Sequence, residues 1–117
     1  MAATRRDPSD CLPLTPALFH VLLSLADGQK HGYAILKEVA ERTGGTVELS
    51  TGTLYGIIKR LLADGLIRES ALGSTDRRRA YRLTPFGRKV ALAEAERLRD
   101  LVLAAQMKKL LTMTAER

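Results

Sequence analysis

The sequence contains one cysteine and no tryptophan, and it has only two phenylalanines and three tyrosines. A single cysteine excludes an intramolecular disulfide and a cysteine-rich metal cluster, which fits a chain that works in a reducing compartment. No apolar run reaches the ~18 residues that a membrane span needs, and the first residues lack the hydrophobic stretch of a signal peptide. The sequence therefore predicts a cytoplasmic protein that does not cross a membrane.

The length of 117 residues predicts one small domain, too small for an enzyme with a large buried cleft. The composition is that of an ordinary globular protein, but the formal net charge is +6. Most of the excess lies between residues 68 and 89, which hold seven basic residues and two acidic ones. Such a segment favours nucleic acid as the partner, and an anionic membrane or an acidic protein surface are alternatives that charge alone leaves open.

The first half of the chain has three stretches with the apolar spacing of helices. Residues 1–13 before them are polar, contain proline and show no periodicity, which predicts a mobile N-terminal tail. Thr15 and Pro16 supply a cap and a first-turn proline for the first helix. The predicted helices run from residue 16 to the Asp27-Gly28 pair, from about 32 to 42, and, after the β-like segment "TVEL", from 50 to 64. Either Ser50 or Thr51 can cap the third of them.

The second half predicts a β-hairpin and a long helix. Two strand-like stretches at about 67–72 and 79–84 are joined by "GSTDR", whose composition favours a turn. Thr84 and Pro85 then begin a helix that continues to about Met113. The apolar surface of this helix exceeds what one small body can cover, so it predicts a homodimer rather than a tail folded back on its own domain. The predicted dimer-interface residues are Leu98, Leu101, Val102, Leu103, Met107, Leu110 and Leu111.

The third helix has one unusual face. At about 100° per residue, Leu54, Ile58 and Leu61 point to the core, whereas the opposite side carries two glycines, Gly52 and Gly56. Glycine on an exposed helix costs about 0.5–1 kcal/mol relative to alanine, so these two positions call for a benefit. Close approach to a DNA groove is one such benefit, with Tyr55, Lys59 and Arg60 able to contact phosphates or bases. Tight helix packing beside a solvated basic face is the alternative.

The order helix, helix, helix, hairpin is that of a winged helix-turn-helix. Arg77, Arg78 and Arg79 at the hairpin could enter a minor groove or contact phosphates as a wing, although such a run is also typical of a solubilising turn. Strand alternation places Arg79 on the face of Tyr81 and Leu83, which would tie it to the body of the domain instead.

Three blocks of sequence resemble the PadR family of bacterial transcriptional regulators, specifically its short, one-domain type. They are "LTPALFHVLLSLADGQKHGYAILKEV", "GTLYGIIKRLLADGLI" and "RRRAYRLTPFGR", in the order and at the spacing of that family. The resemblance implies a mainly α fold with a small β-hairpin, in which a winged helix-turn-helix at 14–84 precedes a dimerisation helix at 85–117. It implies a homodimeric regulator, usually a repressor, that binds a pseudo-palindromic operator in double-stranded DNA.

The resemblance also assigns roles to individual residues. His31, Gly32 and Tyr33 match the step of the family that begins the second helix, where a structural role is implied. Some relatives bind aromatic compounds near the dimer interface, but this chain has no aromatic residue after Phe86, which leaves room only for a smaller apolar effector or for none. The implied DNA contacts are Thr51, Gly52, Thr53, Tyr55, Lys59, Arg77 and Arg78, with Arg79 less firmly assigned.

The remaining function classes find little support. Cys11, His20 and His31 show no catalytic or metal-ligand spacing, so we predict no enzyme, no metal and no cofactor. The rival to a DNA-binding regulator is a winged-helix interaction module whose basic wing contacts an acidic protein. A strong preference for one DNA sequence would distinguish the two, because fold alone does not fix function.

Overall fold

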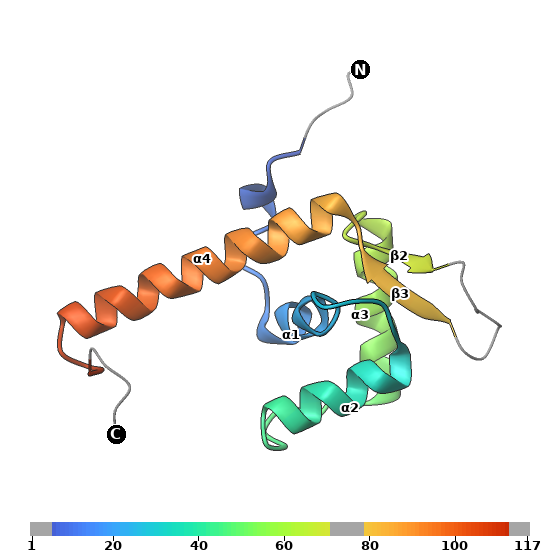
Figure 1. Cartoon of the computed structure of the whole chain (residues 1–117), viewed down its shortest axis with the longest axis horizontal. Coiled ribbons are helices and arrows are strands. Elements are labelled where there is room, and N and C mark those ends of the chain that lie inside the picture. The colour runs from blue at the N-terminus through green and yellow to red at the C-terminus, as the bar shows by residue number, and fades with distance from the viewer. Residues whose placement is uncertain (1–5, 71–78, 113–117) are drawn as a thin grey trace.

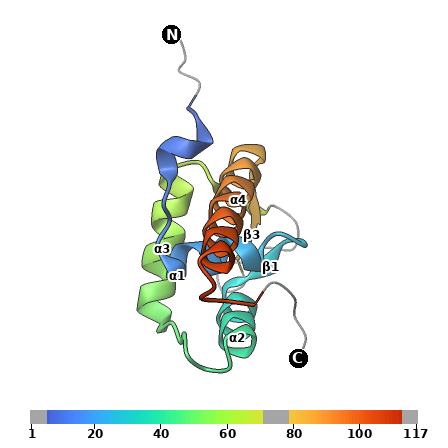
Figure 2. The same cartoon turned by 90° about the vertical axis from the view of Figure 1, so that its left-hand side faces the viewer.

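The computed structural model of the chain describes residues 6–70 and 79–112, so the predicted wing residues Arg77 and Arg78 lie outside the described part. Three helices form a small body, and the fourth crosses it and projects beyond it (Figure 1). Seen along this fourth helix, α3 lies on one side of the body and the sheet on the other (Figure 2). In chain order the elements are η1 (Pro8–Cys11), α1 (Pro16–Ser24), β1 (Lys30–His31), α2 (Gly32–Arg42), α3 (Thr51–Ala63), β2 (Ile67–Ser70), β3 (Ala80–Leu83) and α4 (Pro85–Met107).

Side-chain caps fix where three of the helices begin. The oxygen atoms of Thr15, Ser50 and Thr84 each accept a hydrogen bond from a backbone N–H three residues further on, at 3.2, 3.0 and 2.9 Å. Proline in the first turn of α1 and α4 loses no hydrogen bond, because that N–H has no partner within a helix. These predicted helix starts are confirmed.

The long helix is shorter than predicted. It ends at Met107 instead of continuing to about Met113, and 23 residues give it a length of about 35 Å. Lys109 adopts a positive φ of 67°, and the N–H of Leu110 bonds back to the carbonyl of Ala105 at 2.9 Å. Many helices end at a residue with positive φ, and that residue is usually glycine. Here Lys109 takes this conformation, so the sequence has no glycine or proline that would have predicted the end of the helix.

The sheet has one strand more than predicted. Its order is β1-β3-β2 and both pairings are antiparallel, with Lys30 opposite Tyr81 and Arg68 opposite Arg82. β1 has only two residues, too few for a periodic pattern, and it exists because β3 offers a free edge. The β-like segment "TVEL" forms no strand; the N–H of Val47 instead bonds the hydroxyl of Thr43 at 3.1 Å.

One apolar core joins the helices to the sheet. Burying a large apolar side chain contributes about 1.5–3 kcal/mol, so the buried cluster is a major favourable term in the stability of the domain. The residues predicted to face the core from the third helix, Leu54, Ile58 and Leu61, are 0–2% exposed. The full cluster is Val21, Leu22, Leu25, Ile35, Val39, Leu54, Ile58, Leu61, Leu66, Ile67, Tyr81 and Val90.

The predicted tail contains a short helix. The N–H of Ser9 donates to the carboxylate of Asp7 at 2.9 Å, and this bond caps the 3-10 helix Pro8–Cys11. The 3-10 helix packs against α4. The Arg6 guanidinium lies 4.3 Å from the centre of the Phe86 ring and donates to the carbonyl of Asp64. The sequence did not predict this helix, because a capping aspartate and a contact with a distant helix produce no periodic pattern of apolar residues. The mobility of residues 1–13 stays a prediction.

Candidate nucleic-acid interface

One face of α3 is open to solvent along its whole length. The residues predicted to contact DNA from this helix are all exposed, while the alternate face is buried in the core. The exposed set is Thr51, Gly52, Thr53, Tyr55, Lys59 and Arg60. The structure thus brings these six residues together on one surface, as the helical spacing requires.

The two glycines on this face are not needed for packing within the described chain. A Cβ atom built on Gly52 or on Gly56 meets no atom within 4 Å. Both residues therefore accept alanine without steric conflict, which removes the alternative of tight helix packing inside the monomer. The glycine face of α3 is therefore accessible to a binding partner.

The side chain of Tyr55 on α3 packs against the N-terminal end of α2. Its ring extends to the start of α2, where a Cβ on Gly32 would lie 2.4 Å from the Tyr55 hydroxyl. Gly32 is buried, and Tyr55 remains 45% exposed. Glycine at position 32 thus makes room for the tyrosine, a contact between two motifs that the sequence placed in separate roles.

The N-terminus of α2 carries no side-chain cap. His31 occupies the N-cap position, but it makes no capping hydrogen bond, and its Nδ1 atom is buried without a partner among the described residues. Tyr33, in the first turn, is 75% exposed. In the "HGY" step, Gly32 therefore fits against Tyr55, and the His31 side chain does not cap the helix.

The two basic residues of α3 differ in their contacts. The Nε atom of Arg60 lies 3.8 Å from a carboxylate oxygen of Asp64, and both side chains are more than half exposed. An exposed pair of this kind contributes little to stability and leaves the guanidinium accessible. Within the described residues Lys59 has no ion pair, so its ammonium group is available to an anion.

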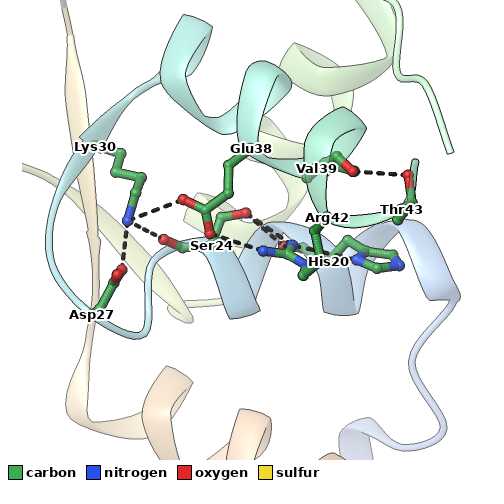
Figure 3. A network of polar contacts seen from close by, with 8 residues as sticks. All are labelled: His20, Ser24, Asp27, Lys30, Glu38, Val39, Arg42 and Thr43. Carbon is green, nitrogen blue, oxygen red and sulfur yellow. Dashed lines mark hydrogen bonds and ion pairs between the residues drawn. The ribbon is translucent and has the colours of Figure 1, made fainter. Parts of the chain in front are cut away.

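A network of charges holds α2 in place relative to α1 (Figure 3). Glu38 on α2 accepts an ion pair from Arg42 at 2.8 Å and from Lys30 at 3.4 Å. Lys30 also pairs with Asp27 at 2.5 Å and donates to the carbonyl of Ser24 at 2.6 Å. Half-buried side chains with several partners fix the angle between the helices better than one exposed pair does.

Arg42 extends this network to the middle of α1. Its Nη2 atom donates to the carbonyl of His20 at 3.0 Å and to the hydroxyl of Ser24 at 3.1 Å. The same atom lies 3.3 Å from Nδ1 of His20. Burial lowers the pKa of His20, and the nearby guanidinium lowers it further, so the neutral imidazole is the form that fits this site.

Arg79 is the one described arginine of the predicted wing trio. It precedes β3, is exposed, and pairs with Glu69 of β2 at 3.1 Å. This cross-strand pair holds the two sides of the hairpin together. Because both side chains are more than 40% exposed, the pair leaves the guanidinium accessible, and the two roles considered for Arg79, a DNA contact or a tie to the body of the domain, both stay predictions.

The C-terminal half of α4 and the residues just after it, up to Leu111, carry an apolar surface that the described part of the chain leaves exposed. Of the predicted interface residues only Leu98 is half-buried. Leu92, which is not among the predicted interface residues, is also 57% exposed. The exposed set comprises Leu101, Val102, Leu103, Met107, Leu110 and Leu111, at 46–80%.

The other half of α4 is anchored by a buried carboxylate. Glu94 is 2% exposed and takes two hydrogen bonds from Arg97, each at 2.8 Å. The Arg97 guanidinium holds the pKa of Glu94 below its usual range, aided by a hydrogen bond from the backbone of Leu14. A buried carboxylate is stable only with such partners. The hydrogen bond from Leu14 therefore attaches α4 to the segment before α1.

A cluster of metal ligands and a helix that could span a membrane are both absent from the described residues. No group of three or more histidine, cysteine, aspartate or glutamate side chains in 6–70 and 79–112 could hold a metal ion. Across the same ranges, none of the helices combines the length and the apolar character that crossing a bilayer requires.

Comparison with known proteins identifies the family. The transcriptional regulator PadR-like family matches residues 21–93, which is more than half of the chain. A transcriptional regulator of Mycobacterium tuberculosis, Rv3488, is 39% identical over 83 residues, covering 70% of this chain and 75% of the relative. An uncharacterised 37.1 kDa protein in transposon TN4556 of Streptomyces fradiae is 41% identical over 81 residues, but the match spans only 22% of that protein.

Solved structures show the same architecture. A PadR family transcription regulator from Clostridium difficile R20291 is 27% identical with a TM-score of 0.64, covering 77% of this chain and 94% of that one. BpsR of Bordetella bronchiseptica, a protein whose DNA binding is regulated by 6-hydroxynicotinic acid, is 26% identical with a TM-score of 0.64, covering 83% and 70%. The predicted fold is confirmed, and the family is one of transcriptional regulators and not of enzymes. The chain therefore belongs to the PadR-like family of transcriptional regulators.

Proposed function

We propose that the protein is a sequence-specific DNA-binding repressor that acts as a homodimer on a pseudo-palindromic operator. In this proposal α3 enters the major groove and the hairpin contacts the adjacent backbone or minor groove as a wing. The observation that carries it is the solvent-facing side of α3, where a Cβ on Gly52 or Gly56 would meet none of the described residues. Small residues beside Tyr55 and Lys59 allow the helix to approach base edges closely.

The test of DNA binding is a fluorescence-anisotropy titration of the purified protein at near-physiological salt. The duplexes are the DNA upstream of its own gene and a scrambled sequence of equal length. A specific site binds about 10³-fold or more tightly than random DNA, so a large preference is expected. If neither this duplex nor any fragment selected from the genome is preferred, the protein is instead an interaction module with a basic surface.

Two single substitutions test the role of α3. Tyr55→Ala and Lys59→Ala should weaken operator binding while the dimer and the fold persist. Lys108→Ala removes an exposed positive charge from the far end of α4 and is the matched control. Unchanged operator affinity in both α3 variants would remove this helix from the recognition role.

The dimer is proposed to form through α4. Leu101 and Leu103 near its C-terminal end are 55% and 47% exposed, and Leu110 and Leu111, just beyond that end, are 80% and 50% exposed. Exposed leucines of this kind are costly for a monomer and ordinary for a subunit interface. Leu101→Asp or Leu103→Asp should yield monomers in size-exclusion chromatography with light scattering, whereas Lys59→Ala should remain dimeric. A dimer that survives both aspartate substitutions would place the interface elsewhere.

Repression and its control complete the proposal. Expressing the protein should lower the output of a reporter driven by its own upstream DNA, and a rise would indicate an activator. BpsR shows that DNA binding in a similar structure can respond to a small molecule. Here the α4 surface has aliphatic and methionine side chains, so a small apolar effector at the dimer interface is proposed in preference to a stacked aromatic drug.

A further inference from the structure

Two arginines face each other across the hairpin. Arg68 on β2 is the register partner of Arg82 on β3, and both side chains are exposed. Like charges directly opposite each other destabilise a pair of strands. Within the described residues neither side chain forms a hydrogen bond or an ion pair.

The opposite face of the same hairpin is built differently. There Glu69 and Arg79 form a complementary cross-strand pair at 3.1 Å. The hairpin thus pairs its charges on one face and opposes them on the other. Protection of a free sheet edge explains a charge on β2, which is the edge strand, but it does not explain Arg82 on the central strand β3.

A third arginine completes the cluster. Arg88, in the first turns of α4, donates from Nη2 to the carbonyl of Ala26 at 3.1 Å, which holds its guanidinium in place. The three arginines line one open hollow of about 410 Å³, together with Leu83, Thr84 and Pro85. No acidic residue is among the described residues that line it.

We propose that Arg68, Arg82 and Arg88 form a binding site for a phosphate group. A guanidinium presents several N–H donors in a fixed plane and binds phosphate through two of them at once, so three around one hollow suit a multiply charged oxyanion. Binding would relieve the repulsion between Arg68 and Arg82. The phosphate can belong to a free phosphorylated small molecule or to the backbone of DNA beside the operator.

The site lies on the hairpin and in the first turns of α4, away from the N-terminal end of α3 where base contacts are proposed to begin. β2 follows directly after the C-terminal end of α3, whereas the residues expected to contact bases begin at its N-terminal end. The 13 residues of α3 separate the two ends by about 20 Å. A ligand in this hollow therefore does not occupy the place of the bases.

The first arm of the test uses inorganic phosphate and the full chain. Thermal unfolding of the native protein is followed during titration with phosphate, with sodium chloride at matched ionic strength as the reference. The double variant Arg68→Gln with Arg82→Gln is compared with Arg99→Gln with Lys108→Gln, which removes two exposed charges elsewhere. If the ligand is a free phosphate, phosphate raises the Tm more than chloride does in the native protein and in the control pair, but not in the Arg68 and Arg82 variant.

The second arm measures binding to a random duplex as a function of salt. Log K falls as log salt rises, and each lost phosphate contact makes this slope shallower by about 0.9. If the phosphates belong to DNA, the slope of the Arg68 and Arg82 variant should therefore be shallower than that of the native protein by about 1.8. This arm rests on the proposed DNA binding, and the first arm does not. If the native protein binds no DNA, the proposed function fails while the first arm still decides the site.

The outcomes separate cleanly. A phosphate-specific rise in Tm that the double variant loses identifies a free anion, and a loss of slope without that rise identifies the DNA backbone. If both arms leave the variant equal to the native protein, the site does not exist. Removing opposed like charges should not unfold the hairpin, and the single variant Arg82→Gln with a circular dichroism spectrum checks this.

Discussion

Replacing Gly56 with alanine should move stability and operator binding in opposite directions. Gly56 lies inside α3, and a Cβ atom there meets nothing within 4 Å. Alanine is favoured over glycine in a helix by about 0.8–1 kcal/mol, so the variant should unfold at a higher temperature, by roughly 4 °C. The gain arises from the unfolded chain and the helix backbone and needs no new contact.

Operator affinity should fall in the same variant. If α3 approaches a groove along its glycine face, an added methyl group keeps the helix from its contacts with base edges. One bidentate base contact is worth about 1–3 kcal/mol, so its loss weakens binding by roughly 5- to 150-fold. Thermal unfolding gives the first quantity, and fluorescence anisotropy against the preferred duplex gives the second.

A matched control separates the two effects. Ala95 is exposed on α4, away from α3, and Ala95→Gly changes helix propensity by the same amount in the other direction. It should lower the Tm and leave operator affinity unchanged. If Gly56→Ala raises stability but binds the operator as the native protein does, DNA does not approach this face closely, and if it lowers stability, the face is packed.

Three other substitutions test the contacts that hold α1 and α4 in the folded domain. Gly87→Ala would put a Cβ 1.8 Å from the carbonyl oxygen of Leu66, so the two backbones must separate, and urea denaturation should show a loss of about 3 kcal/mol or more. The hydrogen bonds from Arg97 lower the pKa of Glu94, so its stabilisation is present at neutral pH and is lost as the pH falls through that lowered pKa; Glu94→Gln should flatten the decline below pH 4.5. Burial lowers the pKa of His20, so the unfolded chain binds a proton that the native state does not, and stability should decline below about pH 6.5; a His20→Gln variant that keeps this decline would contradict the assignment.

Local chemistry made most of the helices predictable. Thr15 and Thr84 each precede a proline, and Ser50 stands before a run with helical spacing, so the signals for these starts lie within a few residues of each other. Cap and proline act on the first turn alone, which is why the prediction did not depend on the rest of the molecule. The open face of α3 followed in the same way, because a helix fixes which residues share a side.

Contacts between distant segments could not be predicted in this way. β1 needs the edge of β3, and the 3-10 helix at Pro8–Cys11 needs the surface of α4. The fit of Tyr55 against Gly32 joins residues from two helices, and only the folded arrangement shows that one explains the other. The end of α4 was missed for a different reason: Lys109 takes the left-handed conformation that usually marks a glycine.

The junction between α3 and α4 determines what a dimer built on α4 would present to DNA. The N–H of Thr84 bonds the carbonyl of Leu66 at 3.0 Å, and the hydroxyl of Thr84 donates to the carbonyl of Gly65 at 2.6 Å. Together with the close contact at Gly87, these bonds fix the first turn of α4 against the end of α3. Since each recognition helix would then follow its own α4, the separation of the two half-sites depends on the angle at which the two α4 helices pack. A half-site spacing near one DNA turn, about 34–36 Å, would constrain that angle, and an effector between the helices would act on DNA binding by changing it.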